Sequence, residues 1–174
     1  MGAEESEPGR PDTVGGAAAA PTSEAPKKYP KGVILGKDGK PCRSCNSFSA
    51  FTSQTRLLAP PKDCPPDSPQ LGRATWTLLH SIAASYPTSP TPTQQSEIMQ
   101  FMSLFSKLYP CWVCAEDFQK YMAKEKMRVG SRDEFGRWLC EAHNEVNRKL
   151  GKKEFDCGKW EERWRTGWKD GRCD

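Results

Sequence analysis

Hydrophobic residues recur at helical spacing from about residue 65 to the end of the chain, and each periodic run has recognisable starting and stopping residues. The first run covers residues 68–86, with Ser68 as a candidate cap, Pro69 in the first turn and Pro87 as the stop. Its expected buried positions are Leu71, Leu78, Leu79, Ile82 and Tyr86. The pattern therefore predicts an amphipathic first helix.

The second run, residues 91–109, begins with a capping-box pattern in which Thr91 and Gln94 can exchange hydrogen bonds, and Pro110 ends it. Its expected buried positions are Ile98, Phe101, Met102, Phe105 and Leu108. A third helix is expected over residues 111–127, because the helix-favouring stretch AEDFQKYMAKEKM follows the proline directly.

The fourth run, residues 131–150, starts with a second capping-box pattern, Ser131 and Glu134, and Gly151 ends it. Its apolar stripe consists of Phe135, Trp138, Leu139, Ala142, Val146 and Leu150. Beyond it, Asp156 can cap a short fifth helix with tryptophans spaced four apart. These are Trp160, Trp164 and Trp168.

The chain shows neither sustained alternation of polar and apolar residues nor enrichment in β-branched residues, so essentially no sheet is expected. Four amphipathic helices joined by short turns pack most economically with their apolar stripes inward. We therefore predict an all-α fold, an antiparallel four-helix bundle with the short fifth helix packed across it. Residues 1–60 hold too few large apolar side chains to offset the entropy of ordering, and we expect a flexible, disordered arm before a domain at residues 61–174.

Charge and hydropathy exclude several classes of partner. The 174 residues carry a net charge of +4, and the basic residues are interspersed with acids, so nucleic acid is not an expected partner. No apolar run approaches the roughly 20 residues of a membrane helix, so we expect no membrane span. The acidic amino terminus lacks the basic flank and apolar stretch of a secretory signal.

The eight cysteines include two pairs with Cys-x-x-Cys spacing, Cys111 with Cys114 and Cys42 with Cys45. Cys111 and Cys114 lie at a helix start, where unpaired N–H groups and positive partial charge favour a thiolate. The first sulfur is expected to be exposed and to exchange with an outside thiol, while the second lies one turn inward and resolves. Cys42 and Cys45 lie in the arm, where no core is expected to hold them, and this setting favours a mobile carrier.

Zinc is the main alternative, because two Cys-x-x-Cys pairs can supply four ligands to a non-catalytic, zinc-stapled helical interaction module. In zinc modules of that type the pairs lie roughly 15 to 20 residues apart, whereas two predicted helices separate Cys45 from Cys111. Neither His80 nor His143 has a cysteine pair at finger spacing. The spacing favours redox chemistry without a metal, and a disulfide-rich scaffold with inert pairs is a third hypothesis.

The other four cysteines lie at the borders of the predicted elements. Cys140 and Cys157 bracket the corner between the fourth run and the fifth helix, as a structural staple would. Cys64 and Cys173 lie at the two borders of the core, and their positions leave pairing within a chain and pairing between chains open.

The segment CEAHNEVNRKLGK in the fourth run crowds polar groups onto a helix whose other face is apolar, so this face is either solvated or meets a polar partner. Together with GRATWTLLH in the first run, the YPCxxC helix start and ERWRTGWKDG near the end, it closely resembles the Erv/ALR family of FAD-linked sulfhydryl oxidases. The resemblance runs over residues 40–174.

This resemblance implies a four-helix bundle with a short fifth helix that holds FAD non-covalently in a homodimer. Aromatic and imidazole rings can stack on adenine and flavin, and Arg and Lys can meet the pyrophosphate. The implied flavin contacts are Gly72, Arg73, Trp76, His80, Tyr86, Cys140, His143, Asn144, Val146, Asn147, Lys149, Lys152, Arg163 and Trp164. Trp160 and Trp168 are expected to pack in the core. Cys64 and Cys173 match positions that cross-link subunits in animal members.

The resemblance also implies a mechanism in which a substrate dithiol reduces the Cys42–Cys45 disulfide and the arm exchanges with Cys111 of the partner. Cys114 then passes the electron pair to the flavin as a thiolate, and oxygen or cytochrome c is the final acceptor. The amino-terminal CRSC and the single carboxyl-terminal cysteine resemble the mitochondrial branch. That branch implies the mitochondrial intermembrane space, with its import oxidoreductase as the protein dithiol substrate. Trp112 either shields the disulfide or forms the surface on which the arm lands.

Overall fold

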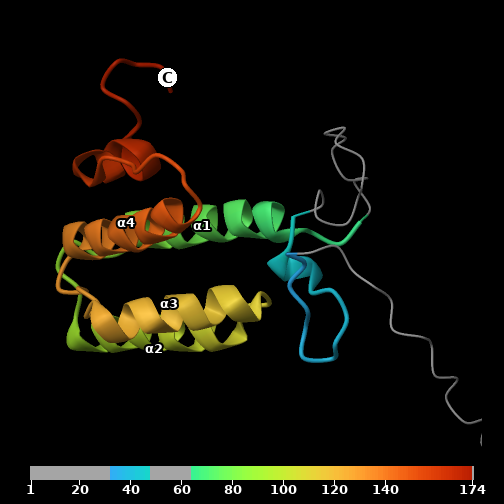
Figure 1. Ribbon diagram of the computed structural model, residues 1–174. Helices are drawn as coiled ribbons and strands as arrows, with labels where there is room; N and C mark the ends of the chain where they lie inside the picture. The colour runs from blue at the N-terminus through green and yellow to red at the C-terminus, as the bar shows by residue number, and fades with distance from the viewer. Residues whose placement is uncertain (1–31, 48–63, 174) are drawn as a thin grey trace, which may run out of the picture.

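Helices dominate the computed structural model, which describes residues 32–47 and 64–173 (Figure 1). The long helices are α1 (Ser68–Ser85), α2 (Pro92–Leu108), α3 (Trp112–Lys124) and α4 (Arg132–Lys149). Three short helical turns accompany them, η1 (Arg43–Cys45), η3 (Cys157–Lys159) and η4 (Glu162–Thr166). Among these described residues the β pairing amounts to one isolated bridge, between Leu35 and Pro41. The all-α prediction is confirmed.

The four long helices form two layers, α1 beside α4 and α2 beside α3, with neighbours running in opposite directions (Figure 1). The predicted antiparallel four-helix bundle is therefore confirmed. Short connections between successive helices favour antiparallel neighbours in this way. The turn η4 packs on α1, and η3 packs on α4, so the end of the chain crosses the upper layer.

Most helix ends follow the sequence signals, but α3 ends at Lys124 and not at residue 127, and the cap of α1 also differs. The cap of α1 is Asp67 and not Ser68, because Gln70 N donates to Asp67 Oδ1 at 3.0 Å and Asp67 N donates to Gln70 Oε1 at 3.1 Å. A carboxylate at this position also faces the positive end of the helix dipole. The predicted capping box at the start of α2 is confirmed, with Thr91 and Gln94 bonded both ways.

The start and end of α4 match the predicted positions, and the structure shows the Ser131 half of the predicted capping box. Glu134 N donates to Ser131 Oγ at 3.1 Å, and Gly151 ends the helix at a φ of 65°, which L residues rarely adopt. All four long helices contribute buried side chains, and α3 contributes Ala115 together with half-buried rings such as Phe118 and Tyr121. The largest of these buried side chains are Leu79, Met102, Phe135, Trp138 and Leu139.

The expected fifth helix is present as two short turns, not as one regular helix. Asp156 Oδ1 accepts from Gly158 N at 2.9 Å at the start of η3, as predicted. Gly167, at a φ of 79°, then ends η4 before Trp168. The three tryptophans contact different residues: Trp160 bonds to Asp133, Trp164 stacks on His80 and Trp168 meets Phe155. Their four-residue spacing therefore does not produce one continuous helix.

Several side chains predicted to be buried are exposed, namely Leu78, Phe101, Leu108 and Leu150. Leu78 points about 100° around α1 from the buried Leu79, and at 57% exposure it lies outside the inward stripe. Leu108 is 77% exposed at the last position of α2. The inward stripe is thus narrower than the apolar pattern suggested.

The segment with Cys42 and Cys45 lies against the bundle, where η1 contacts α1 and α3 (Figure 1). Cys45 is 7% exposed and Asn46 is also buried, so the expectation that no packed structure surrounds this pair is wrong for residues 32–47. The rest of the predicted arm, residues 1–31 and 48–60, lies outside the described residues. In the ranges that the structure describes, no helix combines the length and apolarity needed to cross a bilayer.

Candidate functional site

The Cys111–Cys114 disulfide lies at the start of α3. Cys111 is the cap residue, and Cys114 N donates to Cys111 Sγ at 3.3 Å, so a backbone N–H group of the first turn faces the sulfur, as expected for a stabilised thiolate. The expected exposure is reversed, because Cys111 is 0% exposed and Cys114 is half-buried. A cap side chain folds back over the first turn, which directs the first sulfur inward.

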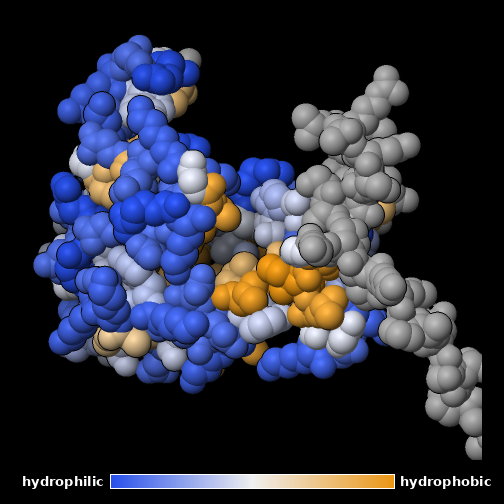
Figure 2. Space-filling view, in the orientation of Figure 1, coloured by the Kyte–Doolittle hydropathy of each residue, from blue (hydrophilic) through white to orange (hydrophobic). Residues whose placement is uncertain are grey.

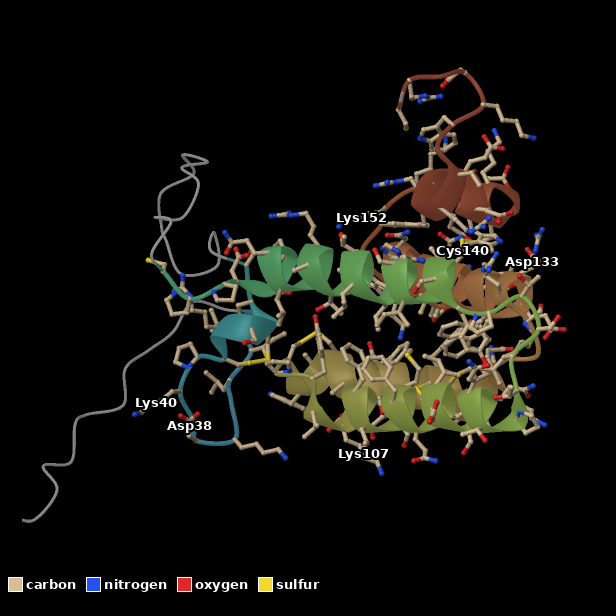
Figure 3. The ribbon with its side chains drawn as sticks, turned by 180° about the vertical axis from the view of Figure 1, so that it is seen from behind. Asp38, Lys40, Lys107, Asp133, Cys140 and Lys152 are labelled. Atoms are coloured by element: carbon tan, nitrogen blue, oxygen red, sulfur yellow. A yellow bond between two sulfur atoms is a disulfide. The ribbon has the colours of Figure 1, made fainter. Side chains whose placement is uncertain are left out.

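A second disulfide, Cys42–Cys45, spans η1 and lies at the same end of the bundle. Trp112 Nε1 donates to the Leu35 carbonyl oxygen at 2.9 Å, which joins the segment with this disulfide to the first residue of α3. Figure 3 shows sulfur atoms where η1 meets the start of α3, the end of the bundle that holds these two disulfides. Both Cys-x-x-Cys pairs predicted from the sequence therefore occur as disulfides on adjoining elements of one chain.

Four rings from α1, α4 and η4 form a stacked cluster. Trp76 and His143 stack with centroids 4.1 Å apart and planes 4° from parallel. His80 and Trp164 stack at 4.4 Å and 7°. His80 Nε2 and His143 Nδ1 are 3.1 Å apart and share a hydrogen bond that joins the two stacks. Planar aromatic ligands are held by parallel rings of this kind.

Both imidazoles in this ring cluster are electrically neutral near neutral pH. Burial, together with the nearby His143 and Arg163, lowers the pKa of His80 to about 3. Burial, with the charge of Lys152, lowers the pKa of His143 to about 4. Among the described residues, His80 Nδ1 is one of two buried side-chain atoms without a hydrogen-bond partner, so this polar atom is free to meet a ligand.

Positive charge borders the ring cluster. The Arg163 guanidinium lies 4.3 Å from the Trp164 ring centroid, and Lys152, labelled in Figure 3, is close enough to His143 to affect its pKa. Lys149, another residue implied for the flavin, instead forms an exposed ion pair with Asp117, with Nζ 3.2 Å from Oδ2. Of the basic residues implied for a pyrophosphate, Arg163 and Lys152 thus lie next to the cluster.

Other predicted flavin contacts have structural partners. Tyr86 lies in the hydrophobic core, and its hydroxyl donates to the Val129 carbonyl at 3.0 Å. Asn144 exchanges two hydrogen bonds of 2.8 Å with the backbone of Phe155, and Asn147 donates to Asn144 Oδ1 at 3.3 Å. The structure does not bring Tyr86 to the ring cluster, whereas the asparagines hold the chain that leads to η3.

The remaining predicted contacts lie along α1 and α4. Gly72 is half-buried, and a Cβ added to it would meet nothing within 4 Å, while Arg73 is exposed and Val146 is half-buried. Sequence reasoning missed Phe118, which meets Trp76 edge-on at 6.4 Å, and Asn46, which organises the segment around Cys42. The position of Asn46 directly after CRSC was the available signal for it.

The predicted Cys140–Cys157 staple is confirmed, and Figure 3 places Cys140 on the side of α4 that faces the carboxyl-terminal turns. Cys64 and Cys173 are exposed and unpaired within the chain. The four cysteines that the zinc alternative needs are paired with each other in two disulfides. In the described ranges, no group of three or more His, Cys, Asp or Glu side chains is placed to hold a metal ion.

A family comparison matches residues 73–165 to the Erv1 / Alr family. The chain belongs to the Erv1 / Alr family. It is 46% identical over 167 residues to the mitochondrial FAD-linked sulfhydryl oxidase ERV1 of Saccharomyces cerevisiae, covering 78% of this chain and 88% of that protein. Residues implied by the resemblance therefore lie on an Erv1 / Alr fold.

Solved structures of the family agree with this assignment. The yeast Erv1 core matches with a TM-score of 0.61 and 53% identity, covering 67% of this chain and 99% of that one. The FAD-binding domain of Erv1 from Saccharomyces cerevisiae matches with a TM-score of 0.58 and 57% identity, covering 60% of this chain and 99% of that one. The ring cluster and the Cys111–Cys114 disulfide both lie within the family-matched range.

Proposed function

We propose that this protein is a FAD-linked sulfhydryl oxidase that converts protein dithiols to disulfides and passes the electrons to oxygen or cytochrome c. The observation that carries the proposal is the Cys111–Cys114 disulfide at the start of α3, joined through Trp112 to the segment that holds a second disulfide. Membership of the Erv1 / Alr family supports it, because the relative from yeast is named for this activity.

The thiol chemistry follows from disulfide exchange. A substrate dithiol gives two electrons to Cys42–Cys45 and leaves as a disulfide, and the resulting dithiol reduces Cys111–Cys114 by the same exchange. Because the segment with Cys42 lies against α3 of its own chain, we propose exchange within one chain as a route beside the exchange with Cys111 of the partner that the resemblance implies. The half-buried Cys114 carries the electron pair onward as a thiolate.

The residues of the ring cluster fit the cofactor. Neutral His80 and His143 stack with Trp164 and Trp76, and His80 Nδ1 lacks a partner, so the cluster offers planar faces and a free polar atom. Lys152 and Arg163 supply positive charge for the pyrophosphate. We propose further contacts from Gly72, Arg73, Cys140, Asn144, Val146, Asn147 and Lys149. When bound, FAD supplies a two-electron acceptor that returns Cys111–Cys114 to the disulfide.

The test is the colour and turnover of the purified protein. We expect yellow protein with FAD near one equivalent, bleached by dithiothreitol without air. Cys114→Ala should reduce the rate of oxygen consumption to no more than a few per cent of the wild-type rate. Cys64→Ser is the matched control, because it removes an exposed, unpaired thiol and should leave turnover with dithiothreitol unchanged. Colourless protein with stoichiometric zinc would refute the oxidase, and unchanged oxygen consumption in Cys114→Ala would favour an inert disulfide scaffold.

We also propose that the protein is a homodimer that uses an apolar groove between α1 and α2. The groove is lined by Leu71, Thr75, Phe101, Leu104, Phe105, Leu108, Tyr109 and Pro110. Leu104 and Leu108 are 57% and 77% exposed. A separate gathering of hydrophobic residues lies where η1 meets the start of α3 (Figure 2). Contiguous apolar surface of this kind marks interaction sites on proteins in water. The Erv1 / Alr resemblance, which implies a dimer, supports a second copy as the occupant.

The proposed setting is the mitochondrial intermembrane space, with its import oxidoreductase as the protein dithiol substrate. The name of the yeast relative supports a mitochondrial location. The arrangement of CRSC before the bundle and a single cysteine in GRCD supports the mitochondrial branch of the family. Exposed Cys64 and Cys173 are available to cross-link the two subunits, which fits an oxidising compartment.

A further inference from the structure

The segment 34–46 is held in one shape by its own hydrogen bonds. Asn46 Nδ2 donates to the carbonyl oxygens of Ile34 at 2.8 Å and of Cys42 at 2.7 Å, and Ile34 N donates to Asn46 Oδ1 at 2.8 Å. Cys42 N donates to the Ile34 carbonyl at 3.0 Å. Asn46 is buried, and the Cys42–Cys45 disulfide closes the adjoining turn. A contact that holds any backbone group of segment 34–46 therefore also holds the disulfide in place.

Two sides of the bundle hold this segment. On the α1 side, Ser68 N donates to the Asn46 carbonyl at 3.0 Å, and Arg43 Nε donates to the Pro65 carbonyl at 2.7 Å. These two hydrogen bonds tie the segment to Pro65 and Ser68, at the start of α1. On the other side, η1 contacts α3, whose start holds the Cys111–Cys114 disulfide.

On the α3 side, the contact is the indole N–H of Trp112, which donates to the Leu35 carbonyl at 2.9 Å. Leu35 forms the bridge with Pro41, so its carbonyl belongs to the closed part of the segment. Trp112 is the first residue of α3 and directly follows the buried Cys111. A hydrogen bond there fixes the segment one residue away from the disulfide that it serves.

We propose that Trp112 is a positioning residue, whose indole N–H holds segment 34–46 so that Cys42–Cys45 is presented to Cys111–Cys114. This rests on the proposed function for its role in turnover, but the docking itself does not. The bond is partly exposed to water, so its effect on presentation is moderate. Phenylalanine keeps a ring at this position and removes only the donor.

The test traps the presented geometry without any flavin chemistry. In a Cys45→Ser/Cys114→Ser background, diamide oxidises the Cys42 and Cys111 thiols to an Sγ–Sγ bond. The two thiols lose two protons and two electrons to diamide, which becomes the hydrazine. The rate is followed by mass spectrometry of the linked peptides. Trp112→Phe should slow bond formation about 2- to 5-fold, the size of one partly exposed hydrogen bond, and Trp112→Ala should slow it further.

Trp168→Phe is the matched control, since it removes an indole N–H from the carboxyl-terminal turns, where Trp168 contacts Phe155 and Arg172. Its trapping rate should equal that of the background. Equal trapping rates in Trp112→Phe and the background would overturn the proposal, because the donor would then have no part in presentation. Flavin content measured in parallel should be the same in both tryptophan variants.

Turnover separates this proposal from the proposed function. In the otherwise wild-type chain, Trp112→Phe should lower kcat/KM with a protein dithiol about 2- to 5-fold, while turnover with dithiothreitol, which can attack the half-buried Cys114, is retained. Equal losses with both thiols would contradict a positioning role. A wild-type protein that oxidises no thiol refutes the oxidase, and the trapping rates alone then decide whether Trp112 docks the segment.

Discussion

His80 and His143 show how individual side chains couple the proposed cofactor site to stability. The two rings share a hydrogen bond, and each stacks on a tryptophan. Burial against another ring deprives the protonated, charged imidazole of the hydration that it would have in water, which is why both pKa values lie below 6.5. The neutral rings that suit stacking on a flavin are therefore maintained by the same burial that makes the fold sensitive to acid.

The free energy of unfolding should consequently fall as the pH decreases below about 6.5. With pKa values of about 3 and about 4 in the folded chain, the unfolded chain binds more protons between these values and 6.5, so protonation favours unfolding. The expected slope is up to about 1.4 kcal/mol per pH unit for each histidine. Urea denaturation at a series of pH values, without added FAD, measures it. A His80→Phe/His143→Phe variant should show a flatter slope between pH 6.5 and 5, and an equal slope would contradict the assignment.

At the scale of elements, the contact between α4 and the carboxyl-terminal turns depends on a glycine. Trp160 is 2% exposed, and its Nε1 donates to Asp133 Oδ1 at 2.9 Å at the start of α4. A Cβ at Gly136 would lie 2.6 Å from the Trp160 ring. The ring thus rests directly on the α4 backbone, and the Cys140–Cys157 disulfide closes the same corner one turn further along.

Gly136→Ala should lower the free energy of unfolding by about 1–3 kcal/mol, because the added methyl overlaps a large, buried ring. The higher helix propensity of alanine offsets about 1 kcal/mol of this loss. Gly72→Ala is the matched control in α1, since nothing lies within 4 Å of its Cβ position, and it should leave stability unchanged or raise it. Urea denaturation of both variants checks the difference, and equal effects would show that Trp160 moves aside without cost.

At the scale of the whole molecule, the surface along α2 is the clearest departure from a self-contained bundle. Phe101, Leu104 and Leu108 are exposed, although they lie on a helix that also contributes Ile98 and Met102 to the core. A helix with apolar residues on two sides buries one face in its own chain and offers the other to a partner. A two-fold dimer would cover this groove with the same surface of a second copy.

Leu104→Glu should therefore raise the dimer dissociation constant at least about tenfold, because a carboxylate would have to lose its hydration in an apolar interface. Leu150→Glu is the matched control, since Leu150 is 61% exposed at the end of α4 and lies outside the groove. Sedimentation velocity over a range of concentrations, under reducing conditions that exclude Cys64 and Cys173 cross-links, compares the two. Equal dissociation constants for both variants would show that the dimer interface lies outside this groove.

Local sequence signals determined most of the secondary structure. Thr91 and Gln94, Ser131 and Asp156 predicted their helix starts, because a cap interacts with backbone groups only a few residues away. The spacing of Cys111 and Cys114 at the start of α3 and the motifs around His80 and His143 likewise sufficed to indicate the family. Asp67 took the α1 cap instead of the neighbouring Ser68, a choice between adjacent candidates that the pattern alone did not make.

Only the tertiary structure decided which groups meet. Residues 34–46 have no periodic pattern, and their packing depends on Asn46, Trp112 and the start of α1, which lie apart in the sequence. The same holds for the burial of Cys111, the exposure of Leu104 and Leu108, and the joining of His80 to His143. The sequence by itself determined the four long helices, most of their ends and the two Cys-x-x-Cys pairs, since these depend on neighbours along the chain. The stacking, docking and exposed groove depend on contacts across it, which form only when the bundle closes.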